Sequence, residues 1–212
     1  GKSGRHLTMF EMMGHHAFNK NIDEIYFKEQ TVAYCDDFFV KKIGIPREKI
    51  TYKEQLWHGG GNAGPCLEVL AGGLEIATLV FMNMKEAESG EYKIGNETYE
   101  QNPLNIVDTG YGLERIAWLT QGSKTVYETV FPTVIEWIRN QSSDNGDERL
   151  IMSLADHTKS LSFMLGDGIV PSNVKSGYLA RLLIRRCLRF IEQLNISEPL
   201  EHIIDLHINE LQ

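Results

Sequence analysis

The chain has 212 residues, of which 42% are hydrophobic and 24% are charged, and its formal net charge is −8. This is the composition of a globular protein with one large core or two modest ones, and it argues against disorder. The negative charge argues against nonspecific nucleic-acid binding by the chain as a whole, since such binding needs Lys and Arg, but it leaves room for a local basic patch.

Membrane and secretory segments are not expected. No run of about 18 apolar residues is present, and the N-terminus lacks the apolar core of a secretory signal. Three widely spaced cysteines, Cys35, Cys66 and Cys187, form no C-x-x-C pair, so the pattern indicates neither a disulfide framework nor a cysteine zinc site. We expect reduced thiols and a cytoplasmic protein. The opening at Gly1 and the helical pattern at the other end suggest a piece of something longer.

The first 120 residues mix strand-like and helical segments. If "HLTMFEMM" (6–13) is a strand, Met9 and Phe10 point to opposite faces. The segment 27–44 has helical spacing and ends at Gly44. Two apolar runs, 73–84 and 103–110, are typical of buried strands, and the polar stretch between them is typical of a surface hairpin.

Helices are expected in the remainder of the chain. The acidic loop "SSDNGDE" (142–148) is the expected domain boundary, dividing 1–143 from 144–212. One helix is predicted to stop at Gly166, and a second runs from about Gly177 with an apolar face. From the residues alone we predict an α+β domain followed by an all-α domain.

The last of these helices carries a basic stripe. Arg181, Arg185 and Arg189 recur at every fourth position, and Asn173 lies in the turn before the helix. Such an asparagine could bond base edges while the arginines meet phosphates. For an isolated segment, a solvated face with Ser172 or Asn173 as a helix cap is the simpler interpretation.

The octet "DTGYGLER" (108–115) is predicted to be a strand-to-helix turn. Gly110 and Gly112 would let the backbone approach a ligand, and the following helix N-terminus could hold a phosphate. Asp108 could pair with an amino group, and Arg115 could reach a polyphosphate. The alternative is an ordinary turn with a capping aspartate and a surface arginine.

Two further motifs are weaker. "WHGGGNAGP" (57–65) could be a loop that wraps a small substrate, with Trp57 as a pocket wall, or simply a flexible connector. His15 and His16 resemble half a metal site, but no matching ligand pair is evident, so solvent-exposed or hydrogen-bonded histidines are the favoured interpretation.

Taken together and in order, these motifs resemble one family. "GRHLTMFEMMGHHAFN", "GGGNAGPCLEVL", "GLEIATLVFMNM", "DTGYGLERI" and "ADHTKSLSFMLGDGIVPSNVKSGYLARLLIRRCLRF" together resemble alanyl-tRNA synthetases of the archaeal type, over nearly the whole chain. "DTGYGLERI" resembles the family's class II motif 3. The fold implied is an antiparallel sheet flanked by helices, followed by a helical tRNA-recognition domain.

The resemblance implies an activity and roles for named residues. Alanine would be activated with ATP and Mg²⁺ and then transferred to the terminal ribose of the tRNA. The implied alanine-binding residues are Asp108, Gly110, Trp57 and Val80. The implied ATP-binding residues are Arg115, Phe10 and Met9, and the choice between Met9 and Phe10 as the residue on adenine stays open. Asn173 would read the G·U wobble pair of the tRNA(Ala) acceptor stem, and Arg181 and Arg185 would contact its backbone. No nucleophile or general base is required, since positioning and charge neutralisation suffice.

Parts of the family pattern have no counterpart here. Motif 1, the motif 2 arginine, the editing domain with its zinc ligands, the oligomerisation region and the other half of the G·U clamp are missing, so a fragment is expected. Two alternatives stay open: a paralogue that loads a carrier other than tRNA, and a non-catalytic tRNA-binding relic.

Overall fold

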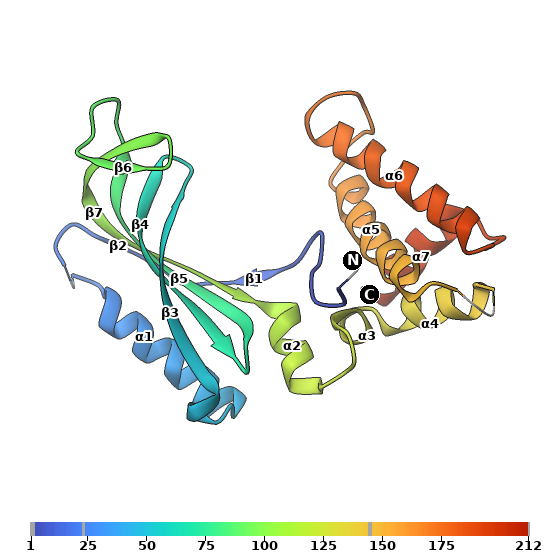
Figure 1. Ribbon diagram of the computed structural model, residues 1–212, viewed down its shortest axis with the longest axis horizontal. Coiled ribbons are helices and arrows are strands. Elements are labelled where there is room, and N and C mark those ends of the chain that lie inside the picture. Colours follow the sequence, from blue (N-terminus) through green and yellow to red (C-terminus); the bar gives the residue numbers. More distant parts are fainter. Residues whose placement is uncertain (1–2, 23, 144–145, 212) are drawn as a thin grey trace. The chain divides into compact units, whose positions relative to one another are not determined.

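The computed structural model describes residues 3–22, 24–143 and 146–211. It divides into two compact units (Figure 1). The sheet unit comprises residues 11–116, and the helical unit comprises the described parts of 1–10 and 117–212.

The sheet unit is built on a seven-stranded antiparallel sheet. Its main path runs β1-β7-β5-β4-β3, and β2 and β6 also pair with β7. The strands are β1 (Met12–Met13), β2 (His16–Asn19), β3 (Ile50–Gly59), β4 (Asn62–Ala71), β5 (Leu74–Glu86), β6 (Tyr92–Ile94) and β7 (Glu97–Gly112). The predicted strands at 73–84 and 103–110 lie within β5 and β7, and the predicted hairpin forms through β6.

One face of the sheet is covered by helix. The helix α1 (Lys28–Asp36) continues as a π-helical turn, η1 (Asp37–Ile43), and ends at Gly44 with a φ of 84°, as the sequence predicts; a short 3₁₀ turn, η2 (Arg47–Lys49), follows. Phe27 packs edge-on against Phe81 of β5, and Phe39 packs against Tyr111 of β7. This face is therefore buried and structural.

Two sequence predictions are corrected by the backbone. The segment 6–11 is not strand, so the face argument for Met9 and Phe10 does not apply. The glycines after Trp57 form no long loop either: Gly60 and Gly61, with φ of 56° and 79°, make a two-residue turn between β3 and β4. Both φ values are positive, as a type I′ hairpin turn requires, so the segment is a tight turn and not a loop that could wrap a substrate.

The helical unit contains α2 (Leu113–Gln121) from Ala117 onward, α3 (Val126–Val130), α4 (Pro132–Gln141), α5 (Glu148–Gly166), α6 (Lys175–Gln193) and α7 (Leu200–Glu210). The helix α5 ends at Gly166 as predicted, and α6 begins two residues before the predicted start at Gly177. The α+β fold with a following helical part is confirmed. The predicted division at 143/144, however, falls inside the helical unit, whereas the contacts divide the chain at Ile116/Ala117.

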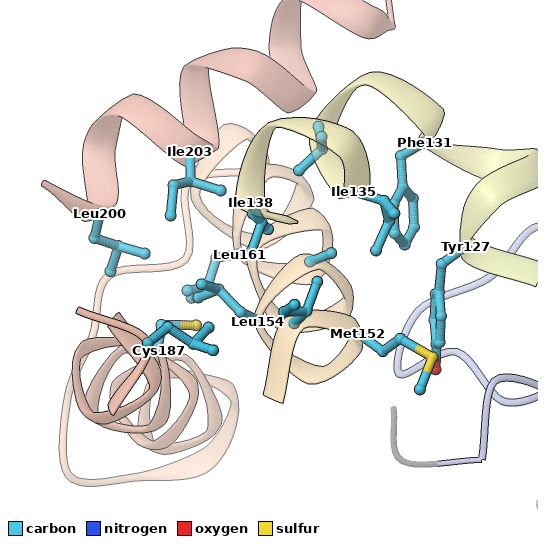
Figure 2. Close-up of a cluster of buried hydrophobic side chains, with 14 of the residues drawn as sticks. Tyr127, Phe131, Ile135, Ile138, Met152, Leu154, Leu161, Cys187, Leu200 and Ile203 are labelled. Carbon is cyan, nitrogen blue, oxygen red and sulfur yellow. The ribbon is translucent and has the colours of Figure 1, made fainter. Parts of the chain in front are cut away.

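A single apolar cluster holds the helical unit together (Figure 2). Leu154 and Leu161 of α5 are fully buried and pack among side chains of α3, α4, α6 and α7. Cys187 and Leu183 supply the face of α6 that meets this core. Because the apolar face of α6 packs on this core, the residues on its other face are left exposed to solvent.

Candidate functional site

A row of directly paired residues crosses the open face of the sheet. His16 of β2 pairs with Asp108 of β7, Asp108 pairs with Val80 of β5, and Val80 pairs with Cys66 of β4. Directly opposed residues of neighbouring strands point to the same face. Since Val107 and Tyr111 of β7 are buried on the helix-covered face, Asp108 lies on the other one.

Apolar side chains border this row on the same face. Val80 and Cys66 form a cluster with Met82, and Trp57 and Ile106 pack against it. Trp57 is half-buried in β3, with Gly59 directly beneath its ring. The structure thus brings Trp57, Val80 and Asp108 together around one small apolar patch with a carboxylate at its edge.

Asp108 has a neighbour that could carry positive charge. Its Oδ1 lies 2.9 Å from His16 Nδ1, and both side chains are about half exposed. The contact holds one carboxylate oxygen in place. The other oxygen is not involved in this pair.

Gly110 keeps the neighbouring position on the face free of a side chain. A Cβ there would lie 2.8 Å from Met12 Sδ, so Met12 occupies the room that a side chain would need. Neither Gly110 nor Gly112 has a positive φ. The glycine is therefore explained by close approach rather than by a turn.

The prediction that residues 108–115 form a turn between a strand and a helix is wrong, because no turn separates the two elements. β7 runs through Gly112 and α2 begins at the next residue, Leu113. The N–H of Leu113 donates to the carbonyl of Glu11, and the carboxylate of Glu114 accepts from the Glu11 N–H. This helix start is thus already bonded and carries an acid, which makes it a poorer phosphate site than expected.

Arg115 is tied to the strand that carries Val80. Its Nη1 donates to the Glu75 carbonyl at 2.9 Å and lies 3.3 Å from Glu75 Oε2. Glu75 Oε1 in turn accepts from Thr78, which pairs directly with Gly110. The Glu75 carboxylate therefore connects the Arg115 guanidinium to Thr78, the residue opposite Gly110.

The two adjacent histidines point to opposite faces. His15 packs among Tyr26, Tyr34 and Tyr111, and burial followed by the charge of His16 lowers its pKa. Its ring nitrogens lie 2.8 Å from Tyr26 Oη and 3.2 Å from Tyr111 Oη. Within the described ranges, no group of three or more His, Cys, Asp and Glu side chains is placed to hold a metal ion.

A cavity of about 280 Å³ adjoins His15 and Tyr111, with a nearly apolar lining that also includes Met13, Tyr34 and Phe38. It lies on the helix-covered side of the sheet. The chemically richer residues are on the other side, so the cavity does not mark the candidate site. Cys35 in the same region is buried, and burial raises the pKa of its thiol to about 11, which disfavours the reactive thiolate.

Met9 and Phe10 belong to the helical unit, outside the sheet unit that carries Asp108. Phe10 is half exposed and Met9 is partly buried. The segment that carries them is anchored just before: the N–H of Thr8 donates to Asp156 Oδ1 at 2.8 Å, and its hydroxyl donates to Asp156 Oδ2.

Two of the predicted RNA-binding residues, Asn173 and Arg181, are in contact near the start of α6, and Arg185 lies one turn further along the helix. Asn173 lies in the turn before the helix, and its Oδ1 accepts a short hydrogen bond from Arg181 Nη1. Arg185 and Arg189 are exposed along the same helix, and in the part of the chain that the structure describes neither forms an ion pair. The basic stripe predicted from the sequence is real.

Some residues of the site were not identified from the sequence. His16, Met12 and Cys66 enter only because strand register places them beside Asp108, Gly110 and Val80. The spacing of a single strand indicates which of its residues share a face, but not which strand lies next to it. Of these three, only His16 was considered as a functional residue in the sequence, as one of two histidines that resemble half a metal site.

Comparison with known proteins agrees with this architecture. A family model described as "tRNA synthetases class II (A)" matches residues 1–152 and, in a second overlapping match, residues 103–212. The chain belongs to this family. Among its relatives are proteins named alanine–tRNA ligase from Methanothrix thermoacetophila, 45% identical, and from Methanococcoides burtonii, 43% identical. Each alignment includes the whole of this chain.

The chain spans 28–29% of the length of these relatives. The first alignment has 262 positions against the 212 residues of the chain, so at least 50 positions of that relative have no counterpart here. Among the described helices, none has the length and apolar character needed to cross a membrane.

Proposed function

We propose that the chain is part of an alanine–tRNA ligase, which activates alanine with ATP and transfers the alanyl group to tRNA(Ala). The observation that carries the proposal is the patch on the open sheet face, where a carboxylate borders a small apolar surface. That combination suits an amino acid with a positive ammonium and a side chain of one methyl group.

Each residue of the patch has a proposed role. Asp108 binds the ammonium group, and Gly110 leaves room for the substrate beside it. Trp57 and Val80 border the methyl group. Such a patch tolerates only a small side chain, because larger ones would meet the indole ring of Trp57 or the strand beneath.

The nucleotide in this proposal is ATP, with Mg²⁺ bound through its phosphates, as is general in the family. Arg115 would contact the polyphosphate, exchanging its present bond to Glu75 for one to an anion of higher charge. Phe10, with Met9 beside it, would stack on adenine. The chain's own contribution is positioning and charge neutralisation, which is what attack of a carboxylate on a phosphate needs most.

The RNA partner is the tRNA acceptor stem, bound at the start of α6. Asn173 would face the G·U pair, while Arg185 and the neighbouring arginines meet the backbone. The exposed guanidinium groups of Arg185 and Arg189, which form no ion pair with any described residue, favour a nucleic acid over a carrier protein.

The change Asp108→Asn tests the alanine site. It keeps the shape of the side chain but removes the charge, so the KM for alanine should rise by on the order of 10², with the KM for ATP little changed. The measurement is alanine-dependent exchange of pyrophosphate into ATP by the protein that carries this chain.

Glu100→Gln is the matched control. Glu100 lies on the same strand and makes a surface pair with Lys85, at 2.9 Å, so its loss should leave both constants unchanged. An unaltered alanine KM in Asp108→Asn would remove Asp108 from the site. Adenylation without any dependence on the G·U pair would favour the carrier-loading paralogue instead.

A further inference from the structure

The turn before α6 is held rigidly. The N–H of Ile169 donates to Met164 O, and the N–H of Ser172 donates to Gly177 O at 3.0 Å. Gly177 has no room for a side chain, because a Cβ there would lie 2.2 Å from Ser172 Oγ and 2.6 Å from Val170 O. The turn therefore presents Asn173 at a fixed place beside the helix.

The amide of Asn173 also has a fixed orientation. Its Oδ1 accepts from Arg181 Nη1, two turns into α6. A guanidinium only donates hydrogen bonds, so it can bind the oxygen of the amide and never the nitrogen. The two N–H groups of Nδ2 are thereby left for a ligand.

A fixed amide recognises one kind of group. Free to rotate about its last bond, an asparagine offers a ligand either a donor or an acceptor. Held by Arg181 at a fixed place, it offers donors, which suit acceptors of an RNA minor groove such as pyrimidine O2, and the position of that oxygen differs between a G·U wobble pair and a G·C pair.

We infer that Arg181 is a positioning residue for RNA specificity, which sets the hydrogen-bond polarity of Asn173, and that it is not a phosphate contact. The inference rests on the proposed function, because it assumes that this end of α6 meets the acceptor stem. Arg185 and Arg189, which form no such bond with any described residue, supply the backbone contacts. The sequence alone treats Arg181 and Arg185 as equivalent, whereas the structure separates them.

The experiment compares Arg181→Met with Arg185→Met in the full chain. Binding of two RNA hairpins, one with the G·U pair and one with G·C in its place, is measured by fluorescence anisotropy over a range of salt concentrations. Both arginines are exposed, so both variants should fold, and circular dichroism checks this.

Arg181→Met should reduce the preference for G·U about 5- to 100-fold, the range of one good base contact, with the salt slope unchanged. Arg185→Met should weaken both hairpins equally and lower the slope by about 0.7 to 0.9, as loss of one phosphate contact does. Asn173→Asp, which can still accept from Arg181 but has no N–H to donate, should lose the preference as Arg181→Met does.

Two outcomes contradict different claims. If Arg181→Met weakens binding of both hairpins equally and lowers the salt slope, Arg181 is a phosphate contact. The inference about Arg181 then fails, while the proposed function stands. If the unaltered chain binds the two hairpins equally, the proposed recognition of the wobble pair fails, and the inference fails with it.

Discussion

At the scale of single residues, two glycines of the sheet unit are required for different reasons. A Cβ on Gly64 would lie 1.9 Å from the Phe81 carbonyl oxygen, which is backbone and cannot move aside. A Cβ on Gly110 would meet only Met12 Sδ, the far end of a flexible side chain. Gly64 is therefore needed by the fold, whereas a Cβ on Gly110 would displace only the end of the Met12 side chain, and in the proposed function Gly110 leaves room for the substrate.

This difference predicts the effect of Gly110→Ala. The variant should lose no more than about 1 kcal/mol of unfolding free energy, since Met12 can rotate away. It should nevertheless raise the KM for alanine at least tenfold, because the added methyl group occupies the place of the substrate. Urea unfolding and pyrophosphate exchange measure the two quantities.

The double variant Gly110→Ala/Met12→Ala separates the two effects. Removing the Met12 side chain relieves its contact with the new methyl group but leaves that methyl group on the face. Recovery of the alanine KM in the double variant would mean that Gly110 serves only to accommodate Met12.

At the scale of elements, the turn and the first part of α6 form one unit. Gly177 is the third residue of the helix, yet it is buried against the turn that carries Asn173. The helix can begin there only because the glycine lets Ser172 and the Val170 carbonyl approach.

Gly177→Ala should therefore displace the turn. Because one of the two close atoms is a backbone oxygen, we expect a loss of about 1–3 kcal/mol in unfolding free energy, with weaker binding of the G·U hairpin. Adding Ser172→Ala removes one of the two clashes and should restore part of the stability. No loss of stability in the single variant would contradict the packing described for this turn.

Elements with long regular patterns were predictable from the sequence, and contacts between them were not. The 3.6-residue spacing of α5 and α6 identified both helices, and β-branched runs identified β5 and part of β7. "DTGYGLER" was mispredicted because glycine usually marks a turn, whereas here Gly110 serves close approach within a strand. The neighbours of Asp108 depend on strand order, which one sequence does not reveal.

At the scale of the molecule, the first described residues join the helical unit by contacts of very long sequence separation. The Tyr127 hydroxyl donates to the His6 carbonyl, 121 positions away, and Thr8 donates to Asp156, 148 positions away. Such contacts leave no local pattern, which explains why the predicted boundary placed residues 1–10 with the sheet. They also place Met9 and Phe10 directly after an anchored residue.

Asp156 and His207 make the interior of the helical unit sensitive to acid. Burial acts to raise the pKa of Asp156, but the His157 ring, whose Nδ1 lies 3.3 Å from Oδ2, and the hydrogen bonds from Thr8 outweigh it, so the pKa lies below its usual value. Burial lowers the pKa of His207 to about 4, and the charge of Lys159 acts in the same direction. Its Nε2 lies 2.9 Å from the Thr158 hydroxyl, so the ring is hydrogen-bonded in the folded protein.

The pH dependence of stability follows from these shifts. Between about pH 6.5 and pH 4 an unfolded His207 binds a proton and a folded one does not, so the unfolding free energy falls as the pH is lowered through this range. A shift of this size corresponds to a loss on the order of 3 kcal/mol. Protonation of Asp156 lowers the unfolding free energy only below the usual carboxyl pKa, so the two groups affect stability in separate pH ranges.

His207→Gln, which keeps a polar partner for Thr158 but does not titrate, should flatten most of the decline between pH 6.5 and pH 4. Urea unfolding at several pH values measures it, followed by tryptophan fluorescence in a Trp57→Phe background, where Trp118 and Trp137 report on the helical unit alone. His15, whose pKa is also lowered, lies in the sheet unit and does not enter that measurement. An equally steep decline in His207→Gln would show that the acid sensitivity comes from another group.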